Sequence, residues 1–242
     1  MSQLLLGNSF ELMKSISSES VDFIFTDPNY NTTQNEWDTG IPLDQMWEQF
    51  TRIIKPNGCI AMWAQSPFDK ILACSNLNMY RYEWIVEKTK ATGHLNSKLM
   101  PMKAHENVLI FYKTLPTYNP QYTEGHTPVH NYTKHTTDGT NYGTTKTGIS
   151  GGGSTRRFPR DVLRFSWDTQ KSKLHPTQKP LAACEYFIKT YTDPGDVVFD
   201  PFMGSGTVCL ASQNLGREYI GIELEQNYYE AAKQRIERER KQ

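Results

Sequence analysis

The chain has 242 residues, a length that fits one large domain or two modest ones. Hydrophobic residues make up 37% and charged residues 21%, which is too apolar for a disordered chain. No run approaches the ~18 apolar residues of a membrane-spanning helix, and the first residues do not have the pattern of a secretion signal. The four cysteines are widely separated and form no C-x-x-C pair, so neither a disulfide framework nor a metal site is expected. We therefore expect a metal-free, globular, cytoplasmic protein without a membrane partner.

The net charge is zero, but the charge is unevenly distributed along the chain. Between Lys88 and Pro180 there are 14 Lys and Arg against 5 Asp and Glu, whereas the rest of the chain has 12 against 21. A solvated surface would account for the excess, but a basic segment with clustered arginines is also typical of polyanion binding. The cluster consists of Arg156, Arg157, Arg160 and Arg164.

Two hydrophobic patterns alternate along the chain, short apolar runs typical of buried strands and helical spacings of apolar residues. Strands are predicted at residues 4–6, 21–26, 59–64, 82–87, 107–112, 197–200 and 219–223. Helices are predicted at 43–54, 68–77, 181–191, 207–215 and from 226 onward. This alternation favours an α/β sheet with helical crossovers. From 114 to 157 the pattern stops, and the polar composition there indicates a functional or disordered insert.

One candidate site is a glycine turn between a strand and a helix, at residues 197–207 (VVFDPFMGSGT). Glycine lets the backbone approach a ligand, and a helix N-terminus attracts an anionic group, although many tight turns use glycine for steric reasons alone. Glu223 ends the next strand 17 residues after Gly206, close to the ~20-residue interval at which an acid meets a ribose. Cys209 breaks the G-x-G-x-x-G pyrophosphate fingerprint. The turn therefore favours a ligand with a carboxylate and one ribose.

A second candidate site is the sequence Asp27-Pro28-Asn29-Tyr30, directly after a predicted strand. An ordinary turn explains these residues equally well. Alternatively, the Asp27 carboxylate and the Pro28 carbonyl supply two acceptors beside the flat ring of Tyr30. Such an arrangement suits the planar amino group of a heterocycle.

A third segment, His175-Pro176-Thr177-Gln178-Lys179-Pro180, precedes the helix predicted at 181–191. Taken alone, it is a proline-bracketed loop in which Thr177 is able to cap the helix. His175 alone is more typical of a loop histidine than of a catalytic base.

The three segments together resemble the S-adenosylmethionine-dependent amino-methyltransferases that modify exocyclic nitrogens of DNA bases. In that family a D/N/S-P-P-Y/F/W motif holds the target amine, an F-x-G-x-G motif binds the cofactor, and an H-P-x-x-K-P segment precedes a helix. The order of the motifs is similar to that of the beta-ordered group, and the resemblance runs from about Leu4 to Ile236. Asn29 replaces the second proline of the family motif, which removes a restraint that would hold Pro28 extended.

The resemblance implies a Rossmann-like methyltransferase fold, with a mostly parallel seven-stranded sheet, one reversed strand and helices on both faces, plus a loop-rich insert. Residues 1–113 would form the catalytic-motif half of the methyltransferase domain. Residues 114–173 would form a DNA target-recognition insert, and residues 174–242 the cofactor-binding half.

The resemblance also implies a function, which is site-specific methyl transfer from S-adenosylmethionine to the N6 of a flipped-out adenine in double-stranded DNA. The implied catalytic residues are Asp27, Pro28, Asn29 and Tyr30. The implied cofactor-binding residues are Asp200, Phe202, Gly204, Ser205, Gly206, Thr207, Glu223, His175, Thr177 and Lys179. Arg156, Arg157 and Arg160 would bind DNA. The resemblance is compatible with a homodimer as well as with a monomer.

Three alternatives remain at this point. The first is methylation of cytosine N4 instead of adenine N6, because family members with an aspartate at the first motif position tend to methylate adenine but do not always do so. A glutamine-modifying methyltransferase uses a similar N-P-P-Y pocket, but there the glycine motif comes first and no basic insert follows. The third is a non-catalytic DNA-binding module on the same fold.

Overall fold

The computed structural model of the chain describes residues 2–28, 40–133, 150–166 and 178–239. It divides into two compact units. The sheet unit comprises Met1–Asn119 and Asp161–Gln242, and the insert unit comprises Pro120–Arg160. All three candidate motifs belong to the sheet unit.

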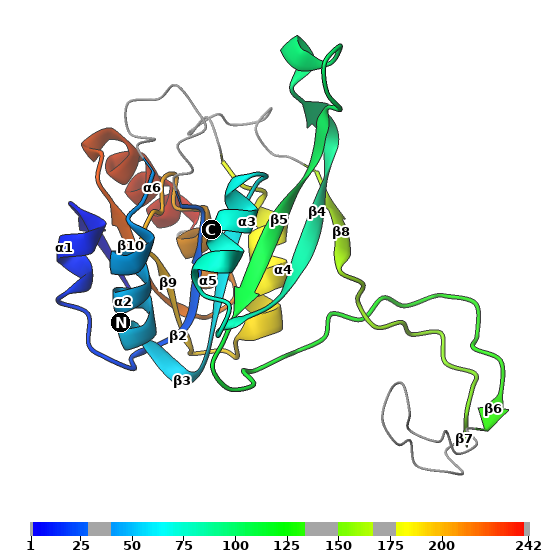
Figure 1. Cartoon of the computed structure of the whole chain (residues 1–242). Helices are drawn as coiled ribbons and strands as arrows, with labels where there is room; N and C mark the ends of the chain where they lie inside the picture. The colour runs from blue at the N-terminus through cyan, green and yellow to red at the C-terminus, as the bar shows by residue number, and fades with distance from the viewer. Residues whose placement is uncertain (1, 29–39, 134–149, 167–177, 240–242) are drawn as a thin grey trace. The chain divides into compact units, whose positions relative to one another are not determined.

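The sheet unit is built on an eight-stranded sheet in the order β1-β10-β9-β2-β3-β5-β4-β8 (Figure 1). Its strands are β1 (Gln3–Leu6), β2 (Val21–Thr26), β3 (Ile54–Ala64), β4 (Tyr80–Thr92), β5 (Lys103–Phe111), β8 (Val162–Phe165), β9 (Val197–Asp200) and β10 (Glu218–Glu223). Only β5 is reversed, because it runs antiparallel to β3 and β4 while the other pairings are parallel. The predicted mostly parallel α/β sheet with one reversed strand is confirmed.

The prediction of seven strands was one too low. The additional strand, β8, lies within the segment that the sequence assigned to the insert, and it pairs with β4 at the sheet edge. Arg164 interrupts its apolar run, and half of its four residues are exposed. Edge pairing with β4, a non-local interaction, stabilises this strand.

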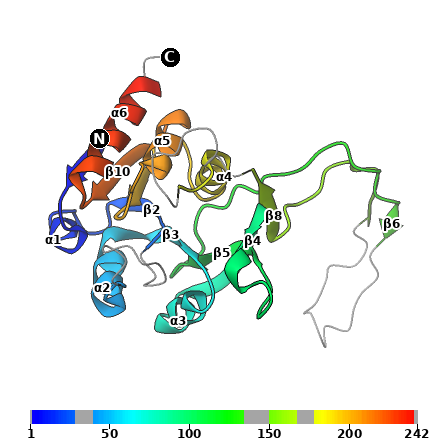
Figure 2. The same ribbon diagram turned by 90° about the horizontal axis from the view of Figure 1, so that it is seen from above.

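The helices cover both faces of the sheet. Figure 2 shows α1, α2 and α3 on one face and α4, α5 and α6 on the other. Their bounds are α1 (Ser9–Met13), α2 (Leu43–Ile53), α3 (Phe68–Ser75), α4 (Leu181–Tyr191), α5 (Thr207–Asn214) and α6 (Gln226–Glu239), and a short 3-10 helix covers His94–Asn96. Among the described residues no helix has the length and apolarity needed to cross a membrane.

Strand β2 shows why the sheet has two cores. Its residues alternate, so that Ile24 packs with α2 on one face while Phe23 and Phe25 pack against α4 on the other. All three side chains are fully buried, and each contributes about 1.5–3 kcal/mol to folding. A strand buried on both faces has a continuous apolar sequence. Strand β2 accordingly lies at the centre of the sheet, and it ends at Thr26, directly before Asp27.

The Lys55-Pro56-Asn57-Gly58 sequence lies within a strand that was predicted to begin only at residue 59. Strand β3 begins at Ile54 and continues through it, and the register with β2 shifts between the Val21↔Ile54 and Phe23↔Cys59 pairs. The turn residues therefore form an irregularity in the strand rather than a loop before it.

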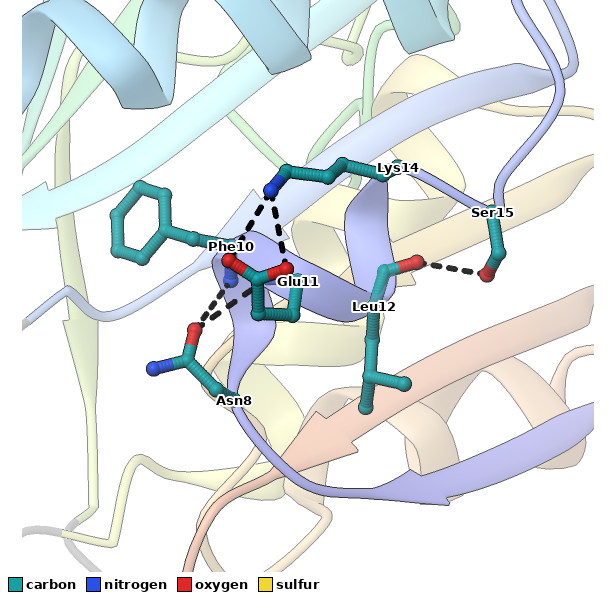
Figure 3. Close-up of polar contacts among 6 residues, drawn as sticks. All are labelled: Asn8, Phe10, Glu11, Leu12, Lys14 and Ser15. Carbon is teal, nitrogen blue, oxygen red and sulfur yellow. Dashed lines mark hydrogen bonds and ion pairs between the residues drawn. The ribbon is translucent and has the colours of Figure 1, made fainter.

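Helix α1 was not predicted, because five residues are too few for a helical pattern. Its N-cap is Asn8, whose side chain accepts hydrogen bonds from the backbone N–H groups of Phe10 at 2.9 Å and Glu11 at 3.4 Å (Figure 3). The ammonium of Lys14 pairs with Glu11 one turn later. The ring of Phe10 lies 6.3 Å from that of Phe202, so α1 packs against the glycine turn.

The insert unit contains little regular structure. Strands β6 (Tyr132–Thr133) and β7 (Ser150–Gly151) pair antiparallel, and a single bridge joins Thr123 to Arg157. Its composition leaves few apolar side chains for a core.

Candidate active site

The candidate residues come together at the carboxyl ends of three adjacent parallel strands. Asp27 follows β2, Asp200 ends β9 and Glu223 ends β10, and these strands are neighbours in the order β10-β9-β2. The hydroxyl of Thr26 donates a hydrogen bond to Asp200 Oδ1 at 2.6 Å, which joins the first motif to the glycine motif. Carboxyl ends of parallel strands are the usual ligand site of such sheets.

Asp200 is a buried acid, with 3% of its surface exposed. Burial raises its pKa to about 7, although hydrogen bonds from the Thr26 hydroxyl and the Phe202 backbone N–H oppose this rise. The carboxyl group is therefore poised to gain or lose a proton near neutral pH.

The side chain of Glu223 holds the glycine turn. Its Oε2 accepts a hydrogen bond from the Gly204 N–H at 2.9 Å, and its Oε1 accepts one from the Glu225 N–H at 2.8 Å. Burial raises the pKa of Glu223, against the effect of these backbone donors. A carboxylate with two oxygens has about four acceptor positions, so two ribose hydroxyls remain compatible with these contacts.

Arg235 of α6 holds the other side of the turn. Its guanidinium donates to the Ser205 carbonyl at 3.1 Å and to the Thr207 hydroxyl at 2.9 Å. Arg235 lies in a run of alternating charges near the end of the chain, a pattern typical of a solvated helix end, but in the structure it contacts the turn. The alternating charges gave no indication that one of them faces the turn.

Lys179 lies against Asp27. Its Nζ is 2.7 Å from Asp27 Oδ2 and 3.0 Å from Glu106 Oε2, and it lies 5.2 Å from the ring centroid of Trp63. Glu106 is also bound through Oε1 to Lys88 Nζ at 2.7 Å. The Lys179 ammonium thus contacts the first motif, whereas the resemblance implies that it binds the cofactor.

The protonation states within this group follow from burial and charge. Burial lowers the pKa of Lys179, but Asp27 and Glu106 outweigh it and raise that pKa above its ordinary value. Burial likewise raises the pKa of Glu106, but Lys179 and Lys88 outweigh it and hold that pKa low. Lys179 and Glu106 are therefore both charged at neutral pH.

The remaining predicted residues of the first and third motifs fall outside the described residues. These are Asn29, Tyr30, His175 and Thr177. The residues of the glycine motif are all described, and Ser205, Gly206 and Thr207 are buried where α5 begins.

The predicted DNA-binding arginines differ in their surroundings within the insert unit. The Arg157 guanidinium donates to the backbone carbonyls of Ser154, Arg156 and Thr127. Arg156 pairs with Glu124 at 2.8 Å and lies 4.1 Å from the ring centroid of Tyr122. The side chain of Arg160 is exposed. Arg157 therefore ties the insert together, and Arg160 is the more accessible cation.

Sequence analysis missed Glu106, Lys88 and Arg235. Glu106 directly precedes the predicted strand at 107–112, and a charged residue at a strand end gives no indication that it is buried. Its neighbours lie on β4 and before α4, far away in the sequence.

The polar groups at this edge suit a cofactor with an amine and ribose hydroxyls. Asp200 and Glu223 supply two buried carboxyl groups, and the buried Gln178 Oε1 has no hydrogen-bond partner among the described residues. An unpaired buried acceptor is costly unless a donor reaches it. Among the residues that the structure describes, no group of three or more His, Cys, Asp or Glu side chains is arranged to hold a metal ion.

Comparisons with known proteins agree with this geometry. A family model described as DNA methylase matches residues 21–234. Type II methyltransferase M.HpaI of Haemophilus parainfluenzae is 28% identical over 98% of this chain and 74% of its own length. Type II methyltransferase M.BglII of Bacillus subtilis is 30% identical over 94% of this chain and 67% of its own. The crystal structure of an M1.HpyAVI–SAM complex has a TM-score of 0.68 and 25% identity, covering 98% of this chain and 99% of that one.

Proposed function

Because this chain belongs to the DNA methylase family of N6- and N4-directed methyltransferases, which use S-adenosylmethionine, we propose that it methylates the N6 of adenine in double-stranded DNA. The observation that carries the proposal is the 2.6 Å hydrogen bond from Thr26 to Asp200. It links the strand that precedes Asp27 to the strand that precedes the glycine turn, and this supports transfer between a cofactor at the turn and an amine at Asp27.

The glycine turn and its acidic neighbours would hold the cofactor. S-adenosylmethionine supplies a methyl group on a positively charged sulfur. The carboxylate of Glu223 would accept hydrogen bonds from the ribose hydroxyls, while Phe202 and the backbone from Gly204 to Gly206 would surround the methionine portion. Asp200 and Lys179 would complete the site, together with His175 and Thr177.

Asp27 and Pro28 would act on the target amine. The lone pair of an adenine N6 is delocalised into the ring, so the nitrogen is a weak nucleophile. The Asp27 carboxylate and the Pro28 carbonyl would accept hydrogen bonds from its two N–H groups, and this favours a tetrahedral nitrogen. The new N–C bond would form as the bond between the methyl carbon and the sulfonium sulfur breaks, and the methylated nitrogen would then lose one proton to solvent. No covalent intermediate with the protein is needed.

Adenine is favoured over cytosine by the residue at position 27. In the family that the motifs resemble, aspartate at this position tends to accompany adenine and serine tends to accompany cytosine. The base would have to leave the duplex, at a cost of a few kcal/mol that stacking on Tyr30 would partly offset. The insert would contact the flanking DNA through its arginines.

The test is methyl transfer from labelled S-adenosylmethionine to plasmid DNA, followed by digestion and mass spectrometry of the nucleosides. N6-methyladenine is the expected product. N4-methylcytosine would move the proposal to the other target of the family, and the absence of any labelled nucleoside would support a DNA-binding module without catalysis.

A matched pair of variants connects the product to the site. Asp27→Ala should abolish most of the labelling, whereas Asp44→Ala, on the exposed surface of α2, should label DNA like the wild type. Equal labelling by Asp27→Ala and the wild type would show that the acceptor lies elsewhere.

A further inference from the structure

Four charged side chains form a continuous series that ends at Asp27. Starting on β4, the ion pairs are Lys88 to Glu106 at 2.7 Å, Glu106 to Lys179 at 3.0 Å, and Lys179 to Asp27 at 2.7 Å. The side chains of Lys88, Glu106 and Lys179 are only 9%, 11% and 10% exposed, whereas Asp27 is 23% exposed. We refer to these four residues as the charge series.

The charge series contains two positive and two negative groups. Burying a charge is unfavourable unless an opposite charge and hydrogen bonds compensate for it. Lys179 is compensated by two carboxylates, and Glu106 is compensated by two ammonium groups. If Glu106 were neutral, the series would carry an excess positive charge directly beside Asp27.

We propose that Glu106 is a positioning residue for methyl transfer, which shares the Lys179 ammonium with Asp27 and thereby keeps the Asp27 carboxylate a strong hydrogen-bond acceptor. The proposal rests on the proposed function, because it concerns the same target amine. Lys179 favours the anionic form of Asp27, and the anion accepts a hydrogen bond more strongly than a neutral carboxyl group does. If the Lys179 ammonium were bound to Asp27 alone, it would withdraw electron density from the Asp27 carboxylate and make it a weaker hydrogen-bond acceptor. Because Glu106 binds the same ammonium, this effect on Asp27 is smaller.

The surroundings hold the Glu106 carboxylate in place. Glu106 lies opposite Val86 in the β4–β5 pairing, so its backbone is fixed within the sheet. Each of its two oxygens contacts a different lysine, which restricts rotation of the carboxylate. Lys179 is in turn placed over the Trp63 ring at 5.2 Å, so it has little room to leave Asp27.

A purely structural ion network that joins β4, β5 and the start of α4 would contain the same contacts, so the experiment must separate the two roles. Glu106→Gln removes the negative charge and keeps the shape. Glu87→Gln is the matched control, because Glu87 lies on the neighbouring strand β4, opposite His105, and its 4.0 Å pair with Arg164 is largely exposed. The double variant Lys88→Met with Glu106→Gln removes one charge of each sign.

The expected result is a loss of kcat by roughly tenfold in Glu106→Gln, with the KM for S-adenosylmethionine changed by less than about twofold. Glu87→Gln should match the wild type. The double variant should regain a substantial part of the lost rate, because the charges around Lys179 and Asp27 balance again. Wild-type kcat in Glu106→Gln, or a double variant no faster than the single one, would overturn the proposal.

A second measurement does not depend on activity. In the protein without DNA or cofactor, acetic anhydride labelling with peptide mass spectrometry reports the reactivity of Lys179 relative to the exposed Lys14. The loss of one carboxylate partner should make the Lys179 amine several-fold more reactive in Glu106→Gln and leave it unchanged in Glu87→Gln. Equal Lys179 reactivity in Glu106→Gln and the wild type would overturn the proposal as well.

The two failures can be told apart. A wild-type protein that methylates no DNA would contradict the proposed function, and with it the role of Glu106. An active wild-type protein whose rate is unaffected by Glu106→Gln would contradict the positioning role alone.

Discussion

Gly206 packs so closely against Ala232 that a Cβ on the glycine would lie 2.9 Å from the alanine Cβ. The same Cβ would lie 3.2 Å from Ile236 Cδ1, and the φ angle of Gly206 is +70°. The glycine at position 206 is therefore required for the contact of the turn with α6. A large side chain at this position would disturb the fold, so its effect on cofactor binding would not be specific.

Gly206→Ala should destabilise the protein more than Gly216→Ala does. Gly216 has a φ of +69° but no atom within 4 Å of its Cβ position, so it measures the backbone strain alone, about 1–2 kcal/mol. Gly206→Ala should cost about 1–3 kcal/mol more, because it also overpacks the contact with α6. Urea unfolding of the two variants measures the difference, and equal losses would contradict the steric argument.

Asp27→Ala should lower kcat by roughly 10²–10³-fold, the range for loss of a group that stabilises the transition state. Binding of S-adenosylmethionine, measured by calorimetry, should stay near that of the wild type. Lys179 keeps Glu106 as a counterion, so the variant should also remain folded. A large loss of cofactor affinity with an unchanged kcat would place Asp27 in the cofactor site instead.

Asp200→Asn should stabilise the protein above neutral pH. The carboxyl group keeps its proton up to about pH 7 in the folded chain but releases it near 3.8 when unfolded, so stability falls as the pH rises between these values. An asparagine retains the Oδ1 acceptor and does not ionise. Each unit of the shift is worth about 1.4 kcal/mol, so the gain should be several kcal/mol near pH 8 and smaller near pH 5. Urea unfolding at both pH values gives the comparison, and a gain independent of pH would contradict a raised pKa.

Arg160→Ala should weaken binding to all duplexes by a similar factor and lower the salt slope by about one unit, as loss of one phosphate contact does. Arg157→Ala should instead destabilise the insert, because it removes hydrogen bonds to the Ser154, Arg156 and Thr127 carbonyls. Fluorescence anisotropy at several salt concentrations measures the slope, with Lys233→Ala on α6 as the control. If Arg160→Ala leaves the slope unchanged, its charge is solvated and the DNA lies elsewhere.

The local pattern of the chain accounts for most of the sheet unit. Apolar runs such as residues 21–26 and helical spacings such as those at 181–191 match the observed elements at both ends. The order of the three motifs along the chain also indicated the family, and the position of two of them directly after predicted strands is compatible with the sheet edge where Asp27 and Asp200 lie. These features depend on neighbours in sequence, and short-range patterns report them directly.

The contacts that organise the site depend on residues far apart in the chain. Glu106 meets Lys179, Arg235 meets Ser205, and β8 joins β4, and each pair is brought together only by strand order and helix packing. A charged residue looks alike in the sequence whether it faces solvent or a buried partner, because its burial is set by elements that pack over it. The motifs were therefore readable from the amino acids alone, whereas the charges that surround Asp27 became visible only once the sheet had placed β4, β5 and the start of α4 side by side.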